Sequence, residues 1–350
     1  MSRINLLNYT TEELKSHLVT LGEKSFRATQ LINWIHQLGN RDFCTMSNLS
    51  LKFREYLANH CSVVIPEMIN EQISVDGTKK WLFKLVDGEL IETVFIPDNH
   101  RGTLCVSSQV GCSVGCPFCA TGKQGLKRNL ETAEIIGQLW FAVNKLAPQS
   151  GVKSHVITNL VFMGMGEPLL NYNNVLKATK LALDDNAYGL SKYRVTLSTC
   201  GIIPEITKLK MDSEISLAIS LHAANNELRD RLVPINRKYP VEKLVKICDH
   251  YFKDRRRKTT VEYIMLDGIN DTPVHAKQLI KLLSNGNYKI NLIPGHVIDD
   301  PNFRGSSQRN LEIFQDLLMK ARIDVRTRKS RGIDIMAACG QLKGEITASE

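Results

Sequence analysis

The sequence lacks any apolar run near the roughly 18 residues needed to span a bilayer. Its first segment, MSRINLLNYTTEELK, carries charged and polar residues where a signal peptide has its apolar core. Low-complexity tracts and repeats of solenoid period are also missing. We therefore expect a cytoplasmic globular protein without membrane attachment.

An excess of negative charge is missing too. The 350 residues include 45 Lys and Arg against 36 Asp and Glu, a net charge of +9, which favours a polyanionic partner. Basic residues cluster at 123–128, 253–258 and 326–331. Charge alone does not decide between nucleic-acid binding and a solvated surface.

Cysteine, in contrast, is abundant for a cytosolic chain. There are nine cysteines, an odd number, and four of them lie within 15 residues. A secreted disulfide framework would spread its bridges along the chain and would need an export signal. Bunched cysteines in a reducing compartment indicate metal or redox chemistry instead.

The first part of the chain, residues 1–95, is predicted to be an accessory domain. Thr10 and Glu13 form a capping-box pattern before a first helix that ends at Gly22, and two more helices are expected near 26–38 and 49–57. Two Asp-Gly pairs then separate short apolar runs, which predicts a β-meander ending in IETVFIP.

Residues 96–350 alternate between strand-like and helix-like patterns. Strands are predicted at 103–108, 156–163, 194–199, 215–222, 260–266, 289–293 and 324–328, with helical patterns between them. Repeated βα units imply a parallel sheet, and periodicity does not choose between a barrel and a doubly wound sheet. In both, the active site is expected beyond the carboxyl ends of the strands.

The loop after the first of these strands carries the most specific motif. Cys112, Cys116 and Cys119 form C-x3-C-x2-C among glycines that let the backbone wrap closely. Three thiolates can hold three irons of a 4Fe-4S cluster and leave the fourth iron open to a substrate. The alternative is a structural zinc site that borrows Cys105 or a histidine. This spacing after a strand of a βα array is typical of radical S-adenosylmethionine (SAM) enzymes.

Polar residues follow several of the later strands. The turn MGMGEP, residues 163–168, could grip the amino group of SAM through its glycines and its acid. Other candidates at strand ends are Ser198, Ser220, Leu221, His222 and Asn291. The polar side chains among them could equally be satisfied by hydrogen bonds at the strand ends.

The remaining cysteines separate into two groups. Four are interpreted as inert buried residues, namely Cys44, Cys61, Cys200 and Cys248. Cys339 lies in a glycine- and alanine-rich loop after the last strand, where a thiol would be accessible, and Cys105 lies in the first core strand.

Taken together, these segments resemble the RlmN family over nearly the whole chain. The motifs that carry the resemblance are FRATQLINWI, IETVFIP, the cysteine loop, FMGMGEPLLN, SLAISLHA, LVPINRKYP and RGIDIMAACGQL. The resemblance implies a partial (β/α)6 radical SAM barrel behind an N-terminal accessory domain. It also implies methylation of carbon 2 of adenosine in 23S ribosomal RNA and in some transfer RNAs. The close relative Cfr methylates carbon 8 of the same ribosomal adenosine and is the alternative.

The same resemblance implies roles for the cysteines outside the loop. Cys339 would take a methyl group from one SAM, and a second SAM bound at the cluster would provide the radical that activates that methyl group. Glu92 would accept the ring proton, and Cys105 would release the product by forming a disulfide with Cys339. Without the resemblance, Glu92 reads as an exposed strand carboxylate.

Further expectations come from the resemblance alone. SAM would contact Gly166, Glu167, Ser198, Ser220, Leu221, His222 and Asn291. Helices at the N-terminus and the basic clusters would hold the RNA, and an electron donor such as flavodoxin or ferredoxin would be needed. The chain departs from the family pattern at Cys200 and in residues 293–305, IPGHVIDDPNFRG.

Overall fold

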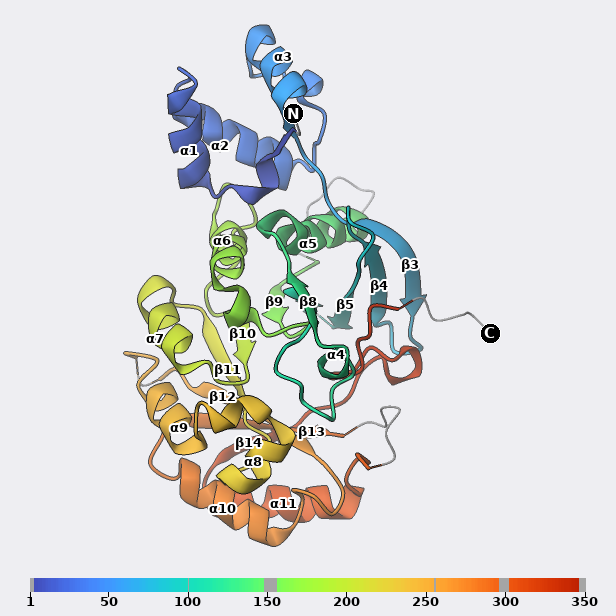
Figure 1. Cartoon of the computed structure of the whole chain (residues 1–350), viewed down its shortest axis with the longest axis vertical. Coiled ribbons are helices and arrows are strands. Elements are labelled where there is room, and N and C mark those ends of the chain that lie inside the picture. The colour runs from blue at the N-terminus through green and yellow to red at the C-terminus, as the bar shows by residue number, and fades with distance from the viewer. Residues whose placement is uncertain (1–2, 100, 148–155, 255, 296–301, 346–350) are drawn as a thin grey trace.

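We analysed a computed structural model of the chain, which describes residues 3–99, 101–147, 156–254, 256–295 and 302–345. A helical unit at the N-terminus stands apart at one end of the molecule (Figure 1). It contains α1 (Thr11–Thr20), α2 (Phe26–Ile32), which continues as a π turn to Gln37, and α3 (Leu51–His60), beside the short parallel pair β1 (Ile4–Asn5) and β2 (Cys61–Ser62). The capping box of Thr10 and Glu13 is present, so the predicted start of α1 is confirmed.

A four-stranded antiparallel meander follows. Its strands are β3 (Glu67–Ile73), β4 (Lys79–Lys84), β5 (Leu90–Asp98) and β6 (Arg101–Cys105). The first two turns carry the predicted Asp-Gly pairs, and Gly77 and Gly88 adopt φ of 83° and 88°. That left-handed conformation favours glycine, which explains the sequence of both turns.

The meander continues into a parallel sheet, because β6 also pairs in parallel with β9 (Asn159–Phe162). The further parallel strands are β10 (Val195–Thr199), β11 (Ser216–Ser220), β12 (Thr259–Met265), β13 (Tyr288–Pro294) and β14 (Asp324–Thr327). The complete sheet has ten strands in the order β14-β13-β12-β11-β10-β9-β6-β5-β4-β3.

Helices occupy the six connections between the parallel strands. They are α5 (Thr132–Leu146), α6 (Tyr172–Leu183), α7 (Ile203–Asp212), α8 (Asn226–Leu232) with α9 (Val241–Asp249), α10 (Pro273–Leu283) and α11 (Gln308–Lys320). This is the predicted α/β class, a partial (β/α)6 barrel with an N-terminal accessory region. Each predicted strand is found with bounds shifted by at most a few residues, whereas α8 was not predicted.

The cysteine loop has a small framework of its own. It is enclosed by a two-stranded antiparallel pair, β7 (Gln109–Gly111) and β8 (Leu126–Asn129), and it contains the single turn α4 (Ala120–Lys123). The framework holds the loop beyond the carboxyl end of β6.

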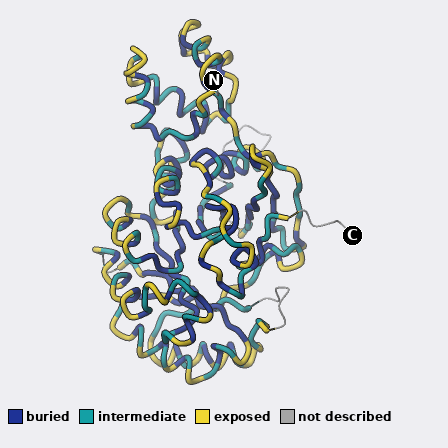
Figure 2. Tube along the Cα trace, in the orientation of Figure 1, coloured by how far each residue is buried: buried dark blue, intermediate teal, exposed yellow. Residues whose placement is uncertain are grey.

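Burial follows the layers of the fold, with the apolar core between the sheet and its helices (Figure 2). One continuous cluster of buried side chains runs from Leu6 and Leu31 in the helical unit to Phe314 in α11. Among the described residues, no helix is long and apolar enough to cross a membrane. The predicted domain boundary at residue 95 lies within β5, and the division stays a prediction.

Candidate active site

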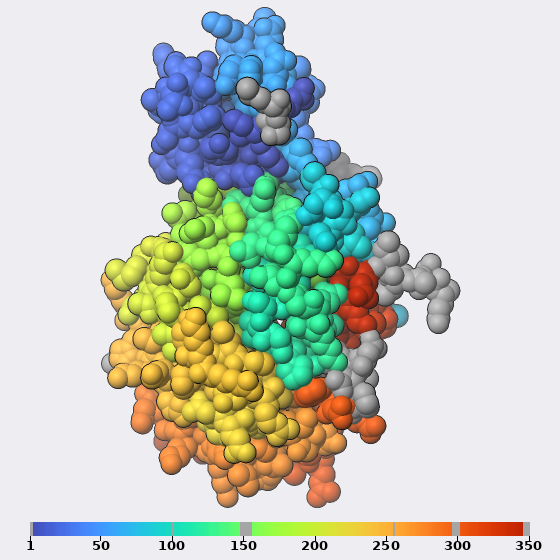
Figure 3. All heavy atoms as spheres, viewed as in Figure 1, coloured from blue at the N-terminus to red at the C-terminus, as the bar shows by residue number. Residues whose placement is uncertain are grey.

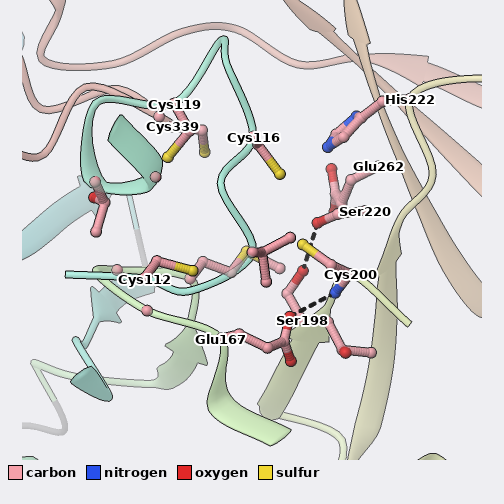
Figure 4. Close-up of a pocket in the computed structure, with 18 of the residues that line it drawn as sticks. Cys112, Cys116, Cys119, Glu167, Ser198, Cys200, Ser220, His222, Glu262 and Cys339 are labelled. Atoms are coloured by element: carbon pink, nitrogen blue, oxygen red, sulfur yellow. Dashed lines mark hydrogen bonds between the residues drawn. The ribbon is translucent and has the colours of Figure 1, made fainter. Parts of the chain in front are cut away.

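A cavity lies at the carboxyl ends of the parallel strands, where the sequence predicted the active site (Figure 4). It is lined by all three loop cysteines, by the turn after β9, by the ends of β10 and β11, and by side chains of β12 and β13. Cys339, from the loop after β14, lines it as well. Segments spread over more than 220 residues of sequence therefore meet at this cavity.

Close backbone contacts shape the cysteine loop. Gly111 has φ of 75°, and a Cβ there would lie 1.8 Å from the carbonyl oxygen of Gly125. A Cβ on Gly122 would lie 2.9 Å from the carbonyl oxygen of Cys116. The loop can close on itself only because both positions are glycine.

The three thiols of the cysteine loop are candidate ligands of a multi-iron cluster. Within the described ranges, no three side chains of His, Cys, Asp or Glu are grouped as ligands of one metal ion. The thiols nevertheless face one cavity and interact electrostatically. Burial, with smaller contributions from Glu167, Cys116 and Cys119, raises the pKa of Cys112 to about 12. Such a set of thiolates needs strong cationic compensation, which bound irons would supply.

The turn after β9 packs directly against the start of the cysteine loop. Gly166 has φ of 99°, and a Cβ there would lie 2.5 Å from the Cβ of Gln109. Glu167 is 1% exposed, and burial raises the pKa of its carboxyl group. Its Oε2 accepts a 2.7 Å hydrogen bond from the backbone N–H of Cys200, and its Oε1 accepts one of 3.1 Å from Leu169. The acid thus joins the turn to the end of β10.

The ends of β10 and β11 bring further predicted residues together. Ser198 and Ser220 line the cavity with their hydroxyl oxygens 3.4 Å apart. His222 lines it too, and its Nδ1 accepts a 3.1 Å hydrogen bond from the backbone N–H of Ile264. Burial, and then the charge of Arg229, lowers the pKa of His222 to about 3. The imidazole is therefore neutral, with its proton on Nε2.

Two predicted SAM contacts lie behind the cavity wall. Leu221 is fully buried, and its backbone N–H donates to the carbonyl oxygen of Glu262 at 3.0 Å. The Asn291 amide donates a 2.8 Å hydrogen bond to Oε1 of Glu262. Neither is among the residues that line the cavity, whereas Glu262 is.

Glu262 and Arg229 are site residues that the sequence reasoning missed. Glu262 is 6% exposed, and burial raises the pKa of its carboxyl group. Its signal in the sequence is an acid in the otherwise apolar strand TVEYIML. Arg229 of α8 is fully buried and donates to the carbonyl oxygens of Cys200, Ser220 and Leu221. It thereby fixes the strand ends next to the cavity.

Glu92 is not the exposed carboxylate that its strand position alone suggested. It is 3% exposed in β5, because the C-terminal segment covers this face of the meander. Its Oε1 lies 3.0 Å from Nζ of Lys80, a buried lysine that sequence reasoning also missed. Glu92 is not among the residues that line the cavity.

The segment that follows Cys339, residues 340–344, is named the strap. Gly340 accepts a 2.7 Å hydrogen bond from the backbone N–H of Ala120, and Leu342 accepts one of 2.7 Å from the Thr121 hydroxyl. The strap therefore ties the Cys339 loop to the cysteine loop. In Figure 3 this red segment lies against the cyan and green residues.

Cys339 and Cys105 approach each other at this point. Cys339 is exposed as a residue, although its thiol faces the cavity, and Figure 4 shows it beside Cys119. Desolvation of its thiol, and then the Glu262 carboxylate, raises the pKa of Cys339 to about 11 against the opposing charge of Arg328. Cys105, at the end of β6, is buried, and its pKa is raised by burial and by the charge of Cys339. The two thiols are thus close enough to interact electrostatically.

The interpretation of the other cysteines needs two corrections. Cys61 and Cys248 are buried as predicted, but Cys44 is exposed, because it lies in a short surface turn after Asp42. Cys200 lines the cavity, and its pKa is raised by a hydrogen bond with Cys116 and by burial. The divergent stretch 293–305 includes residues 296–301, which lie outside the described residues.

Comparison with family models identifies both parts of the chain. Residues 4–63 match the model of the ribosomal RNA large subunit methyltransferase N-terminal domain. Residues 106–280 match the radical SAM superfamily. The first match coincides with the helical unit, and the second covers the cysteine loop and most of the barrel.

One solved structure supports this assignment directly. The chain is 37% identical to a radical SAM methyltransferase from Sphaerobacter thermophilus, with a TM-score of 0.90, over 98% of this chain and 100% of that one. SuiB from Streptococcus suis bound to S-adenosylmethionine is 13% identical, with a TM-score of 0.45, over 65% of this chain and 50% of that one. At that level the second likeness carries no weight for the site.

Proposed function

Because the chain belongs to the RlmN family of radical SAM methyltransferases, we propose that it methylates carbon 2 of an adenosine in 23S ribosomal RNA, with transfer RNA as a second substrate. The observation that supports this most is the position of Cys339. It lines the same cavity as the three loop cysteines, and its charge raises the pKa of Cys105. A radical SAM enzyme that simply cleaves SAM needs neither of these two thiols.

The loop cysteines and the residues around them would bind the cofactors. Cys112, Cys116 and Cys119 would hold a 4Fe-4S cluster, and SAM would lie against Gly166, Glu167, Ser198, Ser220 and His222, with Leu221 and Asn291 supporting the wall. When bound, the cluster and SAM together would supply a carbon radical after reduction by a donor such as flavodoxin or ferredoxin. We propose two SAM molecules per turnover, because a methyl group and a radical are both consumed.

Cys339 would carry the methyl group. Carbon 2 of adenine is electron-poor and the methyl group of SAM is an electrophile, so direct transfer would join two partners of the same polarity. The methyl group would therefore first be transferred from SAM to the Cys339 sulfur. The radical could then remove one hydrogen from this methyl group, and the resulting carbon radical can add to the electron-poor ring. The position of Cys339 beside Cys119 suits this step.

Glu92 and Cys105 would complete the reaction. Glu92, whose carboxylate lies 3.0 Å from the Lys80 ammonium, would accept the ring proton. The RNA adduct would give up its unpaired electron to the bound cluster. Cys105 would then attack the Cys339 sulfur and break its bond to the transferred carbon, which would take up a proton to become the methyl group of the RNA. A Cys105–Cys339 disulfide would remain for later reduction.

The experiment that tests this proposal is an anaerobic assay of the full chain with reconstituted cluster, SAM and dithionite. Ribosomal and transfer RNA would be digested after reaction, and the methyladenosines identified by mass spectrometry. We expect 2-methyladenosine, and none from a Cys339→Ala variant that still cleaves SAM. Methylation at carbon 8 alone would replace our choice with the Cfr-type reaction. A colourless protein with one zinc and no SAM cleavage would overturn the enzymatic role of the cysteine loop.

A further inference from the structure

The Glu92 carboxylate has partners on two sides, both provided by the protein. On one side its Oε1 lies 3.0 Å from the Lys80 ammonium, and the two side chains are 4% and 6% exposed. On the other side its Oε2 accepts backbone N–H groups of Lys343 at 2.6 Å and of Gly344 at 3.0 Å. One buried carboxylate therefore joins strand β4 to the strap.

The pairing of β4 with β5 places Lys80 on the same face of the sheet as Glu92. Lys80 lies opposite Val94, and Glu92 lies opposite Leu82, so Lys80 and Glu92 are diagonal neighbours. Diagonal residues on adjacent strands are within reach of long side chains. Lys80 can thus neutralise Glu92 without any movement of the sheet.

The strap fits closely at its junction with Glu92. Gly344 has φ of 61°, and a Cβ there would lie 2.6 Å from the carbonyl oxygen of Leu90. This close approach lets the backbone N–H of Gly344 reach the carboxylate. At its other end the strap follows directly after Cys339 and is bound to Ala120 and Thr121.

We infer that Lys80 is a positioning residue for Cys339, which it holds in place through Glu92 and the strap. A buried carboxylate is stabilised by a counter-charge, which Lys80 provides 3.0 Å away. An anionic acceptor makes hydrogen bonds roughly twice as strong as a neutral one, so the charge state of Glu92 determines how firmly the strap is held. The role of Lys80 in RNA methylation rests on the proposed function. The hydrogen bonds between Glu92 and the strap do not depend on that function.

The test is Lys80→Met in the full chain, which removes the charge and keeps most of the side-chain length. Lys84→Met is the matched control, because Lys84 lies on the same strand and is exposed. Amide hydrogen exchange of residues 339–345 would be followed without SAM or RNA. We expect the amides of Lys343 and Gly344 to exchange about tenfold faster in Lys80→Met, as for the loss of charge-assisted bonds, and at the wild-type rate in Lys84→Met.

A double variant covers the case in which Lys80→Met does not fold. Lys80→Met with Glu92→Gln leaves no unpaired buried charge, so it should regain thermal stability. Its strap should still exchange several-fold faster than in the wild type, because the acceptor is neutral. Wild-type exchange of the strap in the folded variants would overturn the inference. An inactive wild-type enzyme would overturn the proposed function instead and leave the exchange result unaffected.

Discussion

Cys105 and Cys339 differ in their access to solvent, and this difference leads to a first prediction. Cys105 is buried at the end of β6, whereas Cys339 is exposed as a residue. If Cys105 acts only in product release, the Cys105→Ala variant should still form the covalent bond between Cys339 and the RNA. The reaction should then stop, because no thiol is present to release the product. We expect a nuclease-sensitive band of reduced mobility on a denaturing gel and a loss of turnover of at least about a hundredfold, as for removal of an essential nucleophile.

The matched control for this prediction is Cys248→Ala. Cys248 is also buried, but it lies in α9 and not at the end of β6. It should turn over at close to the wild-type rate without the shifted band. If Cys105→Ala also turned over normally, Cys105 would have no role in release.

Among the structural elements, the hairpin between β3 and β4 contacts the Cys339 loop on the side before the cysteine. Asp76 Oδ2 accepts a 3.0 Å hydrogen bond from the Gly332 N–H. Asp334 accepts bonds from the Ser74 hydroxyl at 2.6 Å and the Val75 N–H at 3.1 Å. The loop is therefore held by the meander on both sides of Cys339.

A second prediction follows for Asp76. Asp76→Ala should lower RNA methylation about tenfold, the effect of one charge-assisted bond, and leave SAM cleavage without RNA unchanged. Asp87→Ala is a stricter control, because it removes the same kind of turn cap, through the N–H of Glu89 instead of Thr78, and also removes the ion pair with Arg128 of β8. A loss in Asp76→Ala no greater than that in Asp87→Ala would show that the contact with Gly332 does not matter.

The junction between the helical unit and the barrel is predicted to be sensitive to acid. His36 is 1% exposed, and its Nδ1 lies 3.0 Å from the Tyr188 hydroxyl. Burial, opposed in part by Asp184, lowers the pKa of His36 from 6.5 to about 3. The unfolded chain therefore binds a proton that the folded chain excludes, so this stability is complete above pH 6.5 and is lost as the pH falls towards 3.

At pH 5 this loss amounts to about 2 kcal/mol of unfolding free energy. Urea unfolding at pH 7.5 and pH 5 would measure it, and His36→Gln should show a drop smaller by that amount. His222 has a similarly lowered pKa in both proteins, so the comparison isolates His36. An equal drop in the two proteins would contradict the assignment.

The molecule as a whole carries a net charge of +9, and its binding of RNA should depend strongly on salt. If the interface contacts five phosphates, raising the salt concentration from 50 to 200 mM would weaken RNA binding about a hundredfold. SAM cleavage without RNA should change little over the same range. Filter binding and a cleavage assay at matched salt concentrations would test this, and an RNA affinity independent of salt would exclude an electrostatic interface.

The sequence predicted the parts of the fold that depend on local patterns. The seven parallel strands, the Asp-Gly turns and the cysteine loop are each set by residues close together in the chain. The partners of Glu92 could not be predicted in this way, because Lys343 lies 251 residues further along. Glu262 was missed for the same reason, because its partners also lie far away in the sequence. Its role becomes visible only in the structure, which brings Cys339 and Asn291 close to its carboxylate.

The strap also has a consequence for the order in which the protein matures. Residues 340–344 are synthesised after every strand of the sheet, yet they cover Ala120 and Thr121 of the cysteine loop and the buried face of β5. Chains fold from the N-terminal part while synthesis continues. The cysteine loop and its framework can therefore form while still open, before the strap closes over them.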